Sequence, residues 1–98
     1  MSRKEELIAQ KERLNDEIGF LFYTDDTEDG LRLIRQAISE IEEYGHIQNT
    51  ADEYIDPYRW SEAFYKELMQ TLKTAEAVYS ELLALENQNE DTYETENN

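Results

Sequence analysis

Large apolar side chains recur along the first half of the chain at the three- and four-residue spacing of amphipathic helices. The spacing predicts a first helix over residues 2–22. Its apolar face consists of Leu7, Leu14, Ile18 and Leu21. Gly19 costs roughly 1 kcal/mol relative to alanine inside a helix, so the helix alternatively ends at Ile18. In that case residues 20–23 become an apolar connector packed on the core.

A second helix is predicted over residues 28–44. The three residues 25–27 are all of N-cap type, and acidic residues follow where the first turn of a helix favours anions. The apolar face consists of Leu31, Ile34, Ile38 and Ile41. Gly45 follows as a typical C′ residue that ends a helix.

A third, longer helix is predicted over residues 57–86, with Pro57 at its first position. It carries two apolar seams. The first consists of Phe64, Leu68, Ala75, Val78, Leu82 and Leu85, and the second of Tyr58, Tyr65, Leu72 and Tyr79. Because two seams on one helix indicate two packing partners, we expect this helix to be the central element.

Three helices with short connections predict an all-α protein, a three-helix antiparallel bundle in up-down-up order with a long C-terminal helix. The 98 residues suffice for one domain, which we place at residues 1–86. In residues 87–98 the only bulky apolar side chain is Tyr93. This segment is therefore expected to be a disordered acidic tail.

The distribution of charge along the chain is the feature that says most about the surface of this bundle. The chain has 9 Lys and Arg against 24 Asp and Glu, a net charge of −15. Residues 25–29, 40–56 and 86–96 contain acids but no Lys or Arg, and together they account for all of that excess. In an up-down-up bundle these segments would form two acidic poles around a balanced waist. Such a surface favours fast association with basic partners. Alternatively, the acidic residues only keep the protein soluble.

The composition excludes several classes of protein. A strongly negative chain repels phosphates, so direct nucleic-acid binding is disfavoured. No stretch approaches roughly 18 apolar residues and no apolar leader is present, so we expect no membrane span and no secretory signal. The chain has no cysteine, which fits an intracellular, cytoplasmic setting.

Two motifs suggest metal binding but are incomplete. Residues 25–30 resemble the first half of an EF-hand calcium loop, but Arg32 and Gln36 stand where an apolar residue and the bidentate Glu belong. Glu43 and His46 have a spacing used in di-metal bundles, but a glycine lies between them. We interpret the first motif as a helix cap and the second as a loop histidine. No metal, no cofactor and no catalytic residue are predicted, and the protein is not expected to be an enzyme.

The leading functional hypothesis is a non-enzymatic acidic protein that binds a basic protein. In its sharpest form it is a nucleic-acid mimic that inhibits a DNA- or RNA-binding partner, similar in general character to inhibitors carried by phages and mobile elements. Tyrosines beside the acids add rigid contact area with a polar tip, although they also suit the end of a bundle. The candidate partner-binding residues are Glu40, Glu42, Glu43, Asp52, Glu53, Tyr54, Asp56, Tyr58, Asp25, Asp26, Glu28 and Asp29.

The alternative is a structural or adaptor protein that docks partner helices through its apolar seams, with the acidic residues serving only solubility.

The predicted helix lengths also indicate self-association. Helix three should be about 45 Å long, helix one about 30 Å and helix two about 25 Å. In up-down-up order, the C-terminal end of helix three would therefore extend beyond the other two helices. We therefore predict a homodimer through the C-terminal end of helix three, unless a break near Ala75 folds that end back or residues 20–23 cover it. The self-association residues are Val78, Tyr79, Leu82, Leu83 and Leu85.

Overall fold

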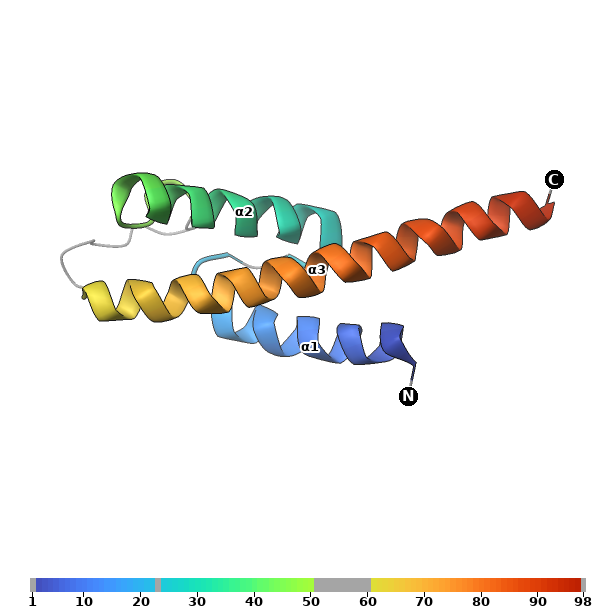
Figure 1. The fold of residues 1–98 in the computed structure, drawn as a ribbon, viewed down its shortest axis with the longest axis horizontal. Helices are drawn as coiled ribbons and strands as arrows, with labels where there is room; N and C mark the ends of the chain where they lie inside the picture. Colours follow the sequence, from blue (N-terminus) through green and yellow to red (C-terminus); the bar gives the residue numbers. More distant parts are fainter. Residues whose placement is uncertain (1, 23, 51–60, 98) are drawn as a thin grey trace.

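The computed structural model describes residues 2–22, 24–50 and 61–97, with side chains as far as residue 87. Within that part of the chain every regular element is a helix: α1 (Arg3–Ile18), α2 (Thr27–Tyr44) and α3 (Glu62–Asn97). The molecule measures 56 × 25 × 20 Å. At 1.5 Å per residue, the 36 residues of α3 span about 54 Å, so this helix alone sets the long dimension (Figure 1).

Short polar side chains define where the helices begin. The Ser2 hydroxyl accepts the Glu5 N–H at 3.1 Å, and the Asp26 carboxylate accepts the Asp29 N–H at 3.0 Å. Each contact satisfies a backbone donor that has no partner within its helix. Gly45 ends α2 in the left-handed conformation, with φ of 81°, as predicted. The first helix ends at Ile18, which was the second of the two predicted ends.

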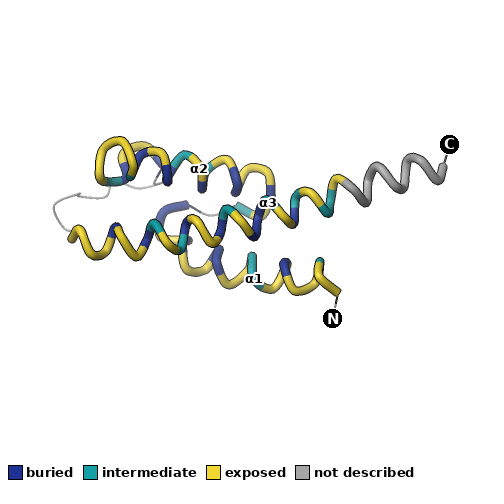
Figure 2. The backbone as a smooth tube through the Cα atoms, in the orientation of Figure 1, coloured by how far each residue is buried: buried dark blue, intermediate teal, exposed yellow. Residues whose placement is uncertain are grey.

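Helix α3 is the central element, and most of the described positions in its two apolar seams are buried, although Phe64 is 37% exposed. The helix packs against both α1 and α2, while no Cα atom of α1 lies within 8 Å of a Cα atom of α2. The buried positions on α3 are Tyr65, Leu68, Leu72, Ala75, Val78, Tyr79 and Leu82. Figure 2 shows the buried positions of the two shorter helices turned toward α3. The prediction of two partners for this helix is therefore confirmed.

The order of the helices differs from the prediction. Arg3 pairs with Glu81 at 2.7 Å and Phe20 contacts Phe64, so α1 runs antiparallel to α3. Arg35 pairs with Glu76 at 3.2 Å, and Thr27, eight residues earlier, reaches Glu86. Helix α2 is thus also antiparallel to α3 and parallel to α1 (Figure 1). The predicted up-down-up order is wrong.

The connector between α1 and α2, residues 19–26, explains the parallel order. Eight residues can span up to about 26 Å, whereas Lys11 lies only about 10 Å before the end of α1. The Lys11 ammonium donates to the Asp25 carbonyl oxygen at 2.9 Å, so the connector does return along α1. Leu21 and Phe22 on the connector are 0% and 1% exposed. Their burial, at about 1.5–3 kcal/mol each, stabilises this return.

Helix α3 differs from its predicted bounds at both ends. It begins at Glu62, where the Ser61 hydroxyl accepts the Phe64 N–H at 3.1 Å, and not at Pro57. Residues 51–60 themselves lie outside the described part of the chain. At the other end the backbone stays helical to Asn97, although the predicted end was Glu86. No Gly or Pro interrupts the sequence there, and Glu and Gln are good helix formers.

The predicted self-association surface lies largely within the core. Val78, Tyr79 and Leu82 are at most 8% exposed, and Leu83 and Leu85 are partly buried against the same core. The prediction assumed that this end of α3 has no partner within the chain. Because α1 and α2 are parallel, both of their N-terminal halves pack there. The basis for dimerisation through these residues is therefore wrong.

Candidate functional site

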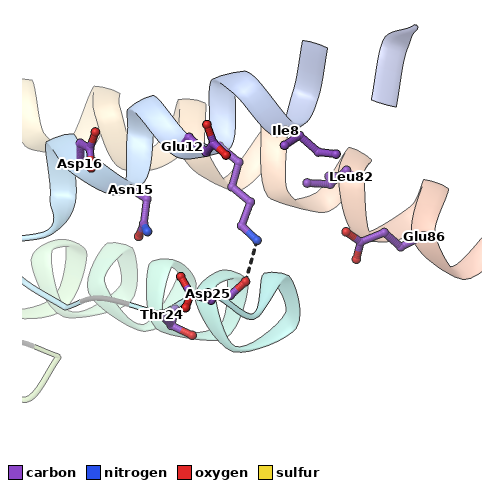
Figure 3. Close-up of a pocket in the computed structure, with 9 residues that line it drawn as sticks. Ile8, Glu12, Asn15, Asp16, Thr24, Asp25, Leu82 and Glu86 are labelled. Carbon is purple, nitrogen blue, oxygen red and sulfur yellow. Dashed lines mark hydrogen bonds between the residues drawn. The ribbon is translucent and has the colours of Figure 1, made fainter. Parts of the chain in front are cut away.

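A crevice of about 550 Å³ lies between α1, the connector and the C-terminal half of α3 (Figure 3). It lies where α1 and α2 pack on α3 with their backbones apart, since no Cα atom of α1 lies within 8 Å of one in α2. Its size falls within the range of roughly 300–1,000 Å³ that is typical of ligand sites. The lining residues are Ile8, Lys11, Glu12, Asn15, Asp16, Thr24, Asp25, Leu82 and Glu86.

The charges around the crevice are unbalanced, with four carboxylates against one ammonium group. In the described part of the chain, Glu12, Asp16 and Asp25 have no ion-pair partner, and Glu86 receives only a 3.5 Å hydrogen bond from the Thr27 hydroxyl. The crevice is therefore a site of negative potential.

Lys11 forms no ion pair with these carboxylates. Its ammonium donates at 2.9 Å to the Asp25 carbonyl oxygen and at 2.9 Å to the Thr27 hydroxyl. It also lies 5.7 Å from the centre of the Tyr79 ring, within cation–π range. Lys11 thus joins α1 to the start of α2 and keeps the crevice walls in place.

Asn15 is a buried polar residue at the crevice. It is 7% exposed, and its Oδ1 accepts no hydrogen bond. Figure 3 shows its amide directed away from α1 toward the connector that carries Thr24. A buried acceptor without a donor costs about 1–3 kcal/mol, so the residue is unfavourable for folding alone. Nearby, Ile8 supplies apolar surface, since it is 39% exposed, whereas Leu82 is buried at 1% exposed.

The sequence analysis missed Glu12, Asn15 and Asp16, although each leaves a signal. Glu12 and Asp16 are like charges four residues apart on a helix, which is mildly destabilising. Asn15 follows Leu14 and interrupts the inner face of α1, where all other buried residues are apolar. Local conflicts of this kind with the helix pattern are typical of functional positions.

Among the predicted partner-binding residues that the structure describes, only the loop acids lie near the crevice. The predicted self-association residue Leu82 also lines it. Asp25 lines it, while Asp26, Glu28 and Asp29 are exposed at the start of α2 on the same end of the molecule. Asp26 is the N-cap, and Asp29 lies 3.6 Å from the Arg32 guanidinium. The capping interpretation of this segment is confirmed, with Gly30 already inside α2.

Glu40 does not belong to the exposed acidic surface. It is 7% exposed, and its Oε1 accepts the backbone N–H groups of Gln48, Asn49 and Thr50 at 2.8, 3.0 and 3.2 Å. Burial acts to raise the pKa of this carboxyl, but these bonds and one from Gln36 outweigh it and lower the pKa. The prediction that Glu40 binds a partner is therefore wrong. Its carboxylate instead stabilises the turn that follows α2.

The other predicted residues of this segment stay apart from the crevice. Glu42 and Glu43 are exposed in the last turn of α2, at the opposite end of that helix. His46 follows the glycine that ends α2, so it is a loop histidine, as predicted. The remaining predicted residues, Asp52, Glu53, Tyr54, Asp56 and Tyr58, lie outside the described part of the chain.

Other kinds of site find no support in the described ranges. No group of three or more His, Cys, Asp or Glu side chains there could hold a metal ion. No helix there is both long and apolar enough to cross a membrane. Comparison of the chain with known protein families, curated proteins and solved structures finds no match.

Proposed function

We propose that this protein is a non-enzymatic inhibitor that binds the basic, nucleic-acid-binding site of a partner protein. The observation that carries the proposal is the crevice, where four carboxylates surround apolar surface and one already engaged lysine. Unpaired carboxylates destabilise a folded chain by mutual repulsion, and a basic partner relieves that repulsion. The net charge of −15 adds long-range attraction to such a partner.

The mimic form of the proposal follows from how the carboxylates are held. Glu12 and Asp16 project from a helix, and the Asp25 backbone is tied to α1 by the bond from Lys11 to its carbonyl oxygen. Acids on rigid elements keep set positions, as phosphates do along a nucleic-acid backbone. A groove that binds phosphates through Lys and Arg would therefore accept them.

The adaptor alternative loses its main support. It requires apolar seams that are open to partner helices, but the seams of α3 pack against α1 and α2 of the same chain. Docking through apolar surface would also be nearly independent of salt, whereas electrostatic binding weakens as salt screens the charges. Salt dependence therefore separates the two functions.

The test begins with capture of partners from a lysate of the source cells at about 50 mM salt, compared with about 500 mM. The captured partner is then purified, and its affinity for DNA or RNA is measured with and without this protein. We expect competition, with salt-dependent binding and inhibition of nucleic-acid binding. A partner that binds nucleic acid equally well in the presence of saturating protein contradicts the proposal.

Charge variants locate the interaction. The double variant Glu12→Gln/Asp16→Asn removes two negative charges at the crevice. The control Glu62→Gln/Glu67→Gln removes two from exposed positions at the start of α3. We expect inhibition to weaken about tenfold or more in the first variant and to change little in the second. Equal weakening would assign the effect to net charge alone.

A further inference from the structure

We propose that the crevice is a receptor for an arginine side chain of the partner, an inference that rests on the proposed function for the existence of a basic partner. The assignment rests on three features that meet in one place: unpaired carboxylates, a buried acceptor without a donor, and adjacent apolar surface.

The carboxylates select a cation. Three of them have no ion-pair partner among the described residues, and they come from two separate segments, α1 and the connector. Because they approach the crevice from different sides, a group with donors pointing in several directions can contact more than one. A guanidinium has five N–H donors in one plane, which suits this arrangement.

Asn15 adds the feature that acids alone do not supply. Asn15 is one of the residues that line the crevice, and its Oδ1 is buried and lacks a hydrogen bond. An N–H donor from a bound side chain would satisfy it, which turns a cost in the free protein into a gain in the complex. A neutral acceptor beside carboxylates is suited to the spread of donors on a guanidinium more than to a compact ammonium.

The apolar surface favours a side chain that has methylene groups as well as a charged end. Ile8 on α1 borders the same crevice as the carboxylates and is 39% exposed, with the buried Leu82 of α3 also on its lining (Figure 3). The three methylene groups of arginine can pack there while the head reaches the polar groups, as in other amphipathic side chains. Lys11 already supplies the ammonium that bonds the Asp25 carbonyl oxygen and the Thr27 hydroxyl. The groups left over are the carboxylates and the Asn15 amide oxygen.

The probe is a short, capped arginine-rich peptide, compared with a lysine peptide of equal length and charge. Both are titrated into the full chain by calorimetry, with backbone amide NMR shifts to locate the contact. We expect the arginine peptide to bind about tenfold more tightly, with shifts centred on Asn15 and the connector. Equal affinity for the two peptides overturns the proposal, as does an absence of arginine binding.

Variants assign the preference to single groups. Asn15→Leu has the same branching without polar atoms, and it should reduce arginine affinity to the level of lysine. Glu12→Gln/Asp16→Asn should weaken both peptides, and Glu62→Gln/Glu67→Gln should weaken neither. If Asn15→Leu retains the preference while its helical circular dichroism matches the wild type, the crevice assignment is wrong.

The outcomes distinguish this inference from the proposed function. The peptide titration needs no natural partner, so it can succeed even if nucleic-acid competition fails. Conversely, competition that is salt-dependent but insensitive to Asn15→Leu would support the mimic and contradict the arginine receptor.

Discussion

Gly30 packs its backbone directly against the ring of Tyr79. A Cβ atom at Gly30 would lie 2.6 Å from Cε2 and 3.1 Å from Cδ2 of that ring. Gly30 is inside α2, where glycine is otherwise unfavourable, and Tyr79 is 1% exposed at the centre of α3. The absence of a side chain at this position is therefore what allows the two helices to approach.

We expect Gly30→Ala to destabilise the protein. The buried ring cannot move freely, so overpacking costs about 1–3 kcal/mol, offset in part by the better helix propensity of alanine. The net loss should be about 1–2 kcal/mol in the free energy of unfolding, measured by urea denaturation. Gly19→Ala is the control, because Gly19 is exposed with φ of −61° and ψ of −20°. A variant at Gly30 that is as stable as wild type would contradict the packing described.

Glu40→Ala should destabilise the turn that follows α2. It removes the acceptor of three backbone N–H groups, those of Gln48, Asn49 and Thr50. Leaving such donors without an acceptor should cost about 2–3 kcal/mol in total. The exposed neighbour Glu43→Ala serves as control and should change the free energy of unfolding by less than about 0.5 kcal/mol. Equal losses in the two variants would show that the carboxylate has no special role.

The contribution of Glu40 should depend on pH. Its pKa is lowered in the folded state from an ordinary value of 4.5. The stabilisation is thus fully present above that value and is lost as the pH falls through the lower folded pKa. The difference in unfolding free energy between wild type and Glu40→Gln should be largest near neutral pH and shrink in acid. A difference that stays constant down to about pH 3 would contradict this.

Asn15→Leu should stabilise the free protein. The change removes an acceptor that has no hydrogen bond and introduces a better helix former on a buried face. We expect a gain of about 1 kcal/mol, measured as a higher midpoint of urea unfolding at constant slope. Gain of stability with loss of arginine binding would mark Asn15 as a binding residue. A clear loss of stability would instead indicate an unrecognised structural role.

Removing the last eleven residues should leave stability nearly unchanged. The final turns of α3 run past the ends of both shorter helices (Figure 1), and among the described side chains Leu85 is the last that packs on the core. A chain that ends at Asn87 should unfold within about 0.5 kcal/mol of the full-length protein. The same truncation removes four acids, so its effect on partner capture measures how much the tail contributes. A loss of more than about 1 kcal/mol would show that the tail packs on the bundle.

The helices were predictable because their signals are local. Periodic apolar residues, the Asp26 cap and Gly45 fix α2 to within one residue. The relative direction of the helices was not predictable, because the direction of α2 depends on the path of the connector. The sequence allowed Leu21 and Phe22 to belong either to the end of the first helix or to an apolar connector. Their burial in the core shows that they belong to a connector that returns along α1. The wrong direction then produced the wrong expectation of an uncovered end of α3.

The candidate site was only partly predictable for the same reason. Asp25 was assigned from charge alone, whereas the other crevice acids come from α1 and α3, far away in sequence. Glu40 was misassigned because its three backbone partners come eight to ten residues later. Charge counting along the chain finds acids but cannot distinguish those that face solvent from those that cap a turn.

The parallel arrangement of α1 and α2 also sets an order of folding. Helices α2 and α3 are neighbours in sequence, so they can pair early, whereas α1 must close a long loop: Arg3 and Glu81 are 78 residues apart. Contacts between distant residues form late, so α1 should be the last helix to dock and the first to open. The crevice exists only once α1 has docked. A bound partner should therefore slow hydrogen exchange in α1 more than in the rest of the protein.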